Sequence, residues 1–228
     1  MISVSLIDRC LIKNDHDRLL RELNSNGLVM PRPLRVSLAQ APTAVRALGL
    51  RRLSELTYGS TPQTRRLTQH LLNTQHPLGH FLPQSTDAHY TTQACPLTTA
   101  TVLSALQRVA QDLPHNDIPS GLEDARQRGM QALAQMQQTD GLFAPPAPPT
   151  DPSPEHRQLT SAFIAYLLAT DLLFRETIDF WSLAQHFDRP DSPVTPETTQ
   201  LWAMAQLTES PNPPSRSRIA NHHYVIAA

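Results

Sequence analysis

A residue pattern that recurs at a fixed offset constrains the fold of this chain more than any other sequence feature. Residues 66–83 and 128–145 carry the same six residue types at the same spacing, displaced by 62 positions, which is the difference between 66 and 128. The chain has only seven glycines, so a register that matches one of them in both copies indicates a true internal repeat. The matched pairs are Arg66 and Arg128, Leu71 and Leu133, Gln75 and Gln137, Gly79 and Gly141, Phe81 and Phe143, and Pro83 and Pro145.

A second pair of segments continues the same offset. Residues 98–106 align with residues 160–168, where Thr98 matches Thr160 and Thr99-Ala100 matches Ser161-Ala162. Residues 126–138 have apolar side chains at three- and four-residue steps, the period of an α-helix. Residues 160–174 are apolar on nearly all sides, as expected of a buried helix. The repeating unit is therefore predicted to be a hairpin of two helices, and the chain to be all-α.

Weaker helical signals flank the two copies. Residues 43–50 and 198–204 resemble the start of further inner helices, residues 177–187 form a short helical segment, and residues 15–26 form a helix that Gly27 ends. We expect about seven to nine helices. The chain is divided into a helical extension over residues 1–33, a repeat domain over residues 34–210 and a proline-rich tail over residues 211–228.

The second copy of the pattern resembles the QW repeat of squalene–hopene and oxidosqualene cyclases. That signature places a basic residue, glycine or alanine, an aromatic residue, leucine, glutamine, glycine and tryptophan at these spacings. Here Ala132 stands in the aromatic position and Phe143 in the tryptophan position, and the first copy has Leu67 and His70 in the glycine and aromatic positions. The matching residues are Arg128, Gly129, Leu133, Gln137 and Gly141.

The resemblance covers about residues 60–170 and implies a fold. Related hairpins build protein prenyltransferase β subunits and plant diterpene cyclases, so the expected architecture is an α/α toroid or a partial toroid. A glutamine side chain offers both a donor and an acceptor, so it can tie the end of an outer helix to the backbone of the next helix. We therefore predict a structural role for the repeated residues Arg66, Gln75, Gly79, Phe81, Arg128, Gln137, Gly141 and Phe143.

The acid that the resemblance implies for terpenoid cyclisation is missing from the sequence. Class II cyclases carry an acidic run just before a Thr-Ala pair at the start of an inner helix, where a carboxylic acid with a raised pKa protonates the substrate. The corresponding stretches here are residues 95–98 and 157–160, and neither contains an acid. The sequence identifies no catalytic residue. If the chain is an enzyme, a divergent prenyltransferase or terpenoid cyclase-like protein is expected.

A zinc site is the weaker of two interpretations of Cys95. Protein prenyltransferases use Asp, Cys and His ligands on zinc, and this chain places Asp87 and His89 close to Cys95 in the sequence. The Asp-x-Cys pairing of that family is absent. The alternative is an ordinary buried thiol at the start of a helix, and we predict no cofactor.

A small repeat protein of this kind would leave apolar faces of its inner helices open, and large apolar patches mark binding surfaces. We expect an isoprenoid or another apolar ligand to bind between the two matched inner helices. The alternatives are a protein-interaction scaffold, as part of a larger assembly or a homo-oligomer, and a divergent zinc-dependent transferase. The candidate ligand-binding residues are Thr98, Thr101, Ser104, Thr160, Phe163 and Tyr166.

The composition of the chain limits the kinds of partner that it is expected to bind. Nineteen basic and 20 acidic residues give a net charge of −1, which gives no overall attraction to nucleic acid. No apolar run approaches the roughly 20 residues that span a bilayer, and the first residues do not resemble a signal peptide. Two cysteines are too few for a disulfide framework, so a cytoplasmic location is expected.

Overall fold

The computed structural model describes residues 3–56, 60–84, 93–114, 117–144, 153–188 and 194–207. These residues form eleven helices and no strand, so the predicted all-helical class is confirmed. Two isolated antiparallel bridges pair Gln75 with Phe81 and Gln137 with Phe143, each across the turn that follows an outer helix.

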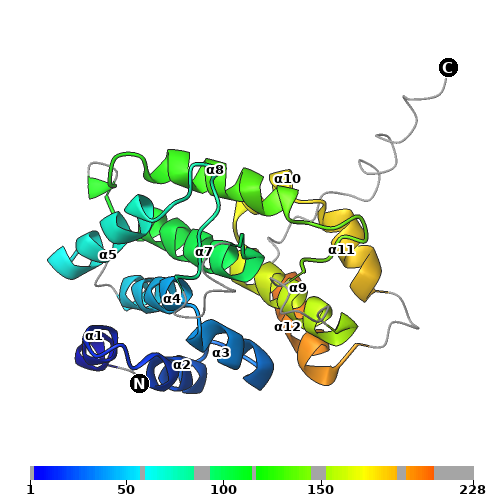
Figure 1. Ribbon diagram of the computed structural model, residues 1–228, viewed down its shortest axis with the longest axis horizontal. Helices are drawn as coiled ribbons and strands as arrows, with labels where there is room; N and C mark the ends of the chain where they lie inside the picture. The colour runs from blue at the N-terminus through cyan, green and yellow to red at the C-terminus, as the bar shows by residue number, and fades with distance from the viewer. Residues whose placement is uncertain are drawn as a thin grey trace.

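The helices fall into three groups (Figure 1). The N-terminal helices are α1 (Val4–Ile12), α2 (His16–Ser25) and α3 (Arg32–Ala39). The inner helices are α4 (Pro42–Glu55), α7 (Pro96–Asp112), α9 (Pro154–Leu168) and α12 (Pro196–Leu207). The outer helices are α5 (Pro62–Asn73), α8 (Leu122–Gln135) and α11 (Phe180–Phe187), and the short α10 (Leu172–Thr177) lies between α9 and α11.

Proline begins every inner helix, at positions 42, 96, 154 and 196. Proline suits the first turn of a helix, because the backbone N–H that it lacks would have no partner there and its φ angle is already helical. Cys95 caps α7 by accepting a hydrogen bond from the Thr98 N–H. Ser153 caps α9 in the same way, through the His156 N–H.

The inner helices lie side by side, and the other two groups cover them on different sides. Helix α7 packs between α4 and α9, and α9 also packs against α12. Figure 1 shows α5 and α8 on one side of α7, and α1 to α3 on the far side of α4. The segments matched by the repeat therefore form pairs of helices. Helices α1 to α3 form a further layer beside α4.

Gln75 fastens the first hairpin to the second. Its Nε2 donates to the Gly79 carbonyl across the turn and to the Ala125 carbonyl of α8, each at 2.8 Å. Its Oε1 accepts from Arg128 at 2.8 Å. The Phe81 N–H, at the end of the same turn, donates to Thr99 at the start of α7 at 3.1 Å. One amide thus links the turn to the next outer helix.

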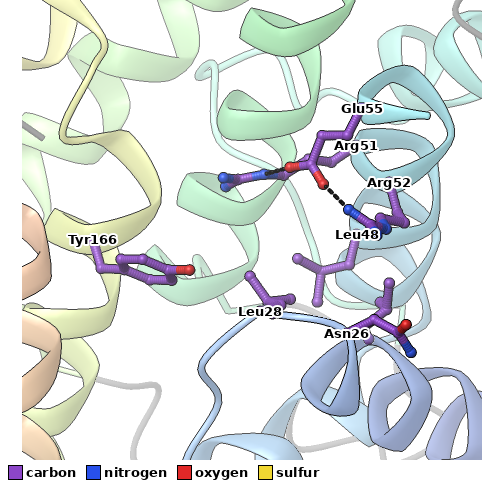
Figure 2. Close-up of a pocket in the computed structure, with 9 residues that line it drawn as sticks. Asn26, Leu28, Leu48, Arg51, Arg52, Glu55 and Tyr166 are labelled. Carbon is purple, nitrogen blue, oxygen red and sulfur yellow. Dashed lines mark hydrogen bonds and ion pairs between the residues drawn. The ribbon is translucent and has the colours of Figure 1, made fainter. Parts of the chain in front are cut away.

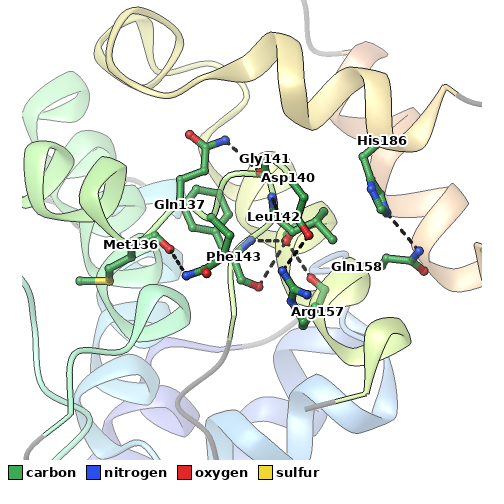
Figure 3. Close-up of polar contacts among 11 residues, drawn as sticks. Met136, Gln137, Asp140, Gly141, Leu142, Phe143, Arg157, Gln158 and His186 are labelled. Carbon is green, nitrogen blue, oxygen red and sulfur yellow. Dashed lines mark hydrogen bonds and ion pairs between the residues drawn. The ribbon is translucent and has the colours of Figure 1, made fainter. Parts of the chain in front are cut away.

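Gln137 occupies the equivalent place in the second hairpin (Figure 3). Its Nε2 donates to the Gly141 and Asp179 carbonyls at 2.9 Å each, and its Oε1 accepts from the Asp179 N–H at 2.9 Å. The Phe143 N–H donates to Ser161 at 2.8 Å. Since Asp179 caps α11, this short helix is the outer helix of a third hairpin.

The glycine of each repeat lies where two hairpins come closest. Gly79 and Gly141 have φ angles of +91° and +82°, a conformation that glycine adopts at little cost. A Cβ atom on Gly79 would lie 2.4 Å from the Arg128 carbonyl oxygen, and one on Gly141 would lie 2.6 Å from the Ser182 carbonyl carbon. The glycines therefore sit in the turn after the outer helix, where a side chain would push the next hairpin away.

Several sequence predictions need correction. The described ranges contain eleven helices where seven to nine were expected for the chain, partly because α1 was missed. The segment 160–174 is not one helix, since α9 ends at Leu168 and Asp171 caps α10. Ile7, Leu19 and Leu23 of the N-terminal helices belong to the same buried cluster as residues of α4 and α9.

Candidate functional site

Five of the six predicted ligand-binding residues are buried in helix interfaces. Thr98, Thr101, Ser104, Thr160 and Phe163 are each at most 2% exposed. The hydroxyl of Thr101 donates to the Leu97 carbonyl and that of Ser104 to the Thr101 carbonyl, so both bind their own helix. These residues do not form an open surface.

The physical reason is the covering of the inner helices. In α7, 13 of the 17 residues are buried, because α4, α8 and α9 surround it. Helices α3 and α12 both pack against α9. The apolar faces that a small repeat protein was expected to expose are therefore used for packing. Tyr166 is the exception among the six, since it is half-buried and lines a pocket.

Cys95 is used as a helix cap. Its side chain is 6% exposed, and its Sγ accepts the Thr98 N–H at 3.4 Å. Burial raises the pKa of the thiol, which disfavours the thiolate that zinc requires. Within the described ranges no group of three or more His, Cys, Asp or Glu side chains could hold a metal ion. Asp87 and His89 lie outside these residues.

The pocket that combines charged groups with an apolar floor lies between α2, α4 and α9 (Figure 2). It has a volume of about 280 Å³. Tyr166 reaches into it from α9, while Arg51, Arg52 and Glu55 come from the last turns of α4. The remaining lining residues are Leu23, Asn26, Gly27, Leu28 and Leu48.

Helical spacing brings the three charged side chains together. Glu55 lies four residues after Arg51 and three after Arg52, so all three share one face of α4. The Arg51 Nε lies 3.0 Å from one Glu55 oxygen, and the Arg52 Nη1 lies 2.9 Å from the other. One carboxylate therefore bridges two guanidinium groups, and the cluster keeps a formal charge of +1.

The electrostatics favour an ionised carboxylate at this position. Burial acts to raise the pKa of Glu55, but the charges and hydrogen bonds of Arg51 and Arg52 outweigh it and hold the pKa below its usual range. Arg51 also donates to the Leu167 carbonyl of α9 at 3.4 Å, so it helps to join α4 to α9. The Nε of Arg52 is buried and has no hydrogen-bond partner.

Gly27 shapes the opposite wall of the pocket. It follows α2 with a φ angle of +105°, so the chain turns sharply and Leu28 lines the floor. Asn26 donates to the Glu22 carbonyl at 2.7 Å, which holds its side chain against α2. The sequence analysis identified Tyr166 and Gly27 but missed the three charged residues. Their i, i+4 spacing was a readable signal, although it could not show what faced them.

Two other hollows are less suited to a ligand. A groove of about 560 Å³ lies between α7, α8 and α10, but its Arg126 is already paired with Asp171 at 2.9 Å and Glu123 at 2.8 Å. A pocket of about 290 Å³ at the start of α9 carries two acids, Glu155 and Glu197, beside Arg32. In each hollow two acids accompany one arginine, so neither has the net positive charge of the pocket between α2, α4 and α9.

Comparison with protein-family models, with curated proteins and with solved structures finds no match to this chain. None of the described helices is long and apolar enough to cross a membrane.

Proposed function

We propose that this chain is a non-catalytic helical repeat protein that binds a small amphiphilic anion in the pocket between α2, α4 and α9. The observation that carries the proposal is the positively charged cluster of Arg51, Arg52 and Glu55, which lies with Tyr166 above a floor of leucines. Guanidinium groups bind carboxylates and phosphates through planar, charge-assisted hydrogen bonds. Leucine side chains favour an apolar chain by burial, at roughly 25 cal/mol per Å².

The pocket volume limits the size of the ligand. A volume of 280 Å³ corresponds to about nine waters at roughly 30 Å³ each. A short acyl chain or a single isoprenoid unit with an anionic head matches this volume. A farnesyl or squalene chain exceeds it, so the expected isoprenoid ligand is narrowed to a short one.

A relationship to the squalene cyclase and prenyltransferase superfamily is part of this proposal. The equivalent hydrogen bonds of Gln75 and Gln137 support a hairpin repeat, and such repeats build α/α toroids. We propose a partial toroid whose inner helices are α4, α7, α9 and α12 and whose open side is filled by α1 to α3. The absence of an acid before Thr98 and Thr160 in the sequence favours binding over cyclisation chemistry.

Calorimetric titration with octanoate, octyl phosphate and octanol tests the ligand class. The two anions are expected to bind at least tenfold more tightly than octanol, since a charge-assisted hydrogen bond contributes roughly 1.5–3 kcal/mol. Arg52→Gln should remove most of this difference. Glu55→Gln should increase the affinity for both anions, because it frees the two guanidinium groups from their carboxylate.

Arg18→Gln is the matched control, because Arg18 is an exposed arginine of α2 that does not line the pocket. Equal affinity for octanol and the anions, or equal losses in the Arg52 and Arg18 variants, would contradict the proposal.

A protein-interaction scaffold is the second candidate function. The exposed side chains of Leu172 and Trp181, at 72% and 53%, favour it. Large exposed apolar residues are costly to leave in water and are common in protein interfaces.

A further inference from the structure

The charges of this protein are separated along the chain, although they nearly cancel in total. Among the described residues up to position 84, eleven are basic and five are acidic, a net charge of +6. Among those from position 117 onward, four are basic and ten are acidic, a net charge of −6. We call these two parts the basic half and the acidic half. The segment between them, 93–114, has one charge of each sign.

The two halves occupy different parts of the fold, but they adjoin where Arg32 lies beside Glu155 and Glu197 at the start of α9. The basic half comprises α1 to α5, and the acidic half comprises α8 to α12. In Figure 1 the blue and cyan helices lie to the left and below and the yellow and orange helices lie to the right, while α8 of the acidic half extends across the top towards α5. Among the described residues a single ion pair joins the halves, between Arg65 and Asp117 at 3.4 Å. Most of the charges are thus not paired between the two halves of one molecule.

Several of the separated charges point to solvent. Lys13 and Arg18 are exposed at the end of α1 and on α2, and they form no ion pair within the part of the chain that the structure describes. On the acidic half, Glu176 is exposed and likewise has no cationic partner among the described residues. Each set can therefore interact with a charge on another molecule.

Exposed apolar side chains accompany the charges on both halves. Ile12 and Val36 are 78% and 55% exposed on α1 and α3. Leu172 and Trp181 are exposed on α10 and α11. An interface needs apolar and aromatic anchors as well as charges, because rim charges mainly set orientation and association rate.

We propose that two copies of this chain associate as an antiparallel dimer, with α1 to α3 of each copy against α10 to α12 of the other. The equal and opposite charges of the two halves make a second copy complementary to the first. A two-fold axis forms the same contact twice and closes the assembly. This inference is independent of the pocket and concerns a different surface.

Sedimentation velocity of the full chain at low and high ionic strength tests the dimer. The Debye length is roughly 30 Å at about 0.01 M salt and roughly 3 Å at about 1 M. We expect a dimer at low salt and a dissociation constant that rises tenfold or more at high salt. A monomer under both conditions overturns the proposal, and so does a dimer that salt leaves unchanged.

Charge-reversal variants test the orientation. Lys13 follows α1 and Arg18 lies in the first turn of α2, and both are exposed, so Lys13→Glu with Arg18→Glu should fold and remain monomeric. Glu176→Arg should also weaken the dimer. Circular dichroism verifies that both variants are folded.

An equimolar mixture of the two variants should dimerise more strongly than either alone. In the mixed dimer one contact joins an unaltered basic half to an unaltered acidic half, whereas each homodimer has two weakened contacts. Folded variants whose mixture shows no recovery would overturn the antiparallel arrangement.

Discussion

Replacing Gln137 with alanine should measure how strongly the repeat junction holds the second hairpin to the third. The change removes two hydrogen bonds donated by Nε2, to Gly141 and Asp179, and one accepted from the Asp179 N–H. A hydrogen bond contributes roughly 1 kcal/mol net, and Gln137 is only half-buried. We therefore expect the free energy of unfolding to fall by about 2–3 kcal/mol.

The neighbouring Gln138 supplies the control. It is exposed and makes one weak side-chain contact, to the Met136 carbonyl at 3.4 Å. Gln138→Ala should change the free energy of unfolding by less than about 0.5 kcal/mol. The two substitutions are chemically identical and adjacent, so their difference isolates the junction.

Urea denaturation followed by circular dichroism gives both values. In a thermal scan, a loss of 2–3 kcal/mol corresponds to a decrease in Tm of roughly 5–10 °C for a protein of this size. If Gln137→Ala costs no more than Gln138→Ala, the amide does not hold the hairpins together, and the structural account of the repeat fails.

Three further predictions follow from particular contacts. Gly141→Ala should cost more than Gly27→Ala in urea denaturation, because both have positive φ angles but only the Cβ at position 141 meets backbone atoms; equal costs would contradict the close approach of α11. Asp171→Ala should lower the free energy of unfolding by about 3 kcal/mol, since the carboxylate is 2% exposed and is paired with Arg126; a loss below about 1 kcal/mol would place this pair with surface ion pairs. Burial lowers the pKa of His16 and His156 below the usual value near 6.5, so the unfolded chain takes up protons that the folded chain resists. The stability present above pH 6.5 should therefore fall as the pH drops below it, and a Tm that stays constant or rises from pH 7.5 to 5.5 would be inconsistent with neutral buried histidines.

Local sequence rules identified the parts of the fold that depend on neighbouring residues. The repeated spacing of Gln75, Gly79 and Phe81 predicted a turn after an outer helix, and that turn is present in both copies. Asp15 and Gly27 marked the ends of α2 within one or two residues. These features are readable because helix caps, turns and positive φ angles depend on contacts over about four positions.

Contacts between segments that are distant in the sequence determined which helix faces are buried and which residues line the pocket. The apolar inner helices were expected to expose a binding face, yet α3 and α12 cover α9 because burying apolar surface lowers the free energy of the whole chain. Arg52 and Tyr166 line the same pocket although 114 positions, the difference between 52 and 166, separate them. The same side-chain pattern is compatible with many arrangements of helices. The sequence by itself therefore determined the helical hairpins and their junctions, and only the tertiary packing decided which faces are buried and which residues meet in a pocket.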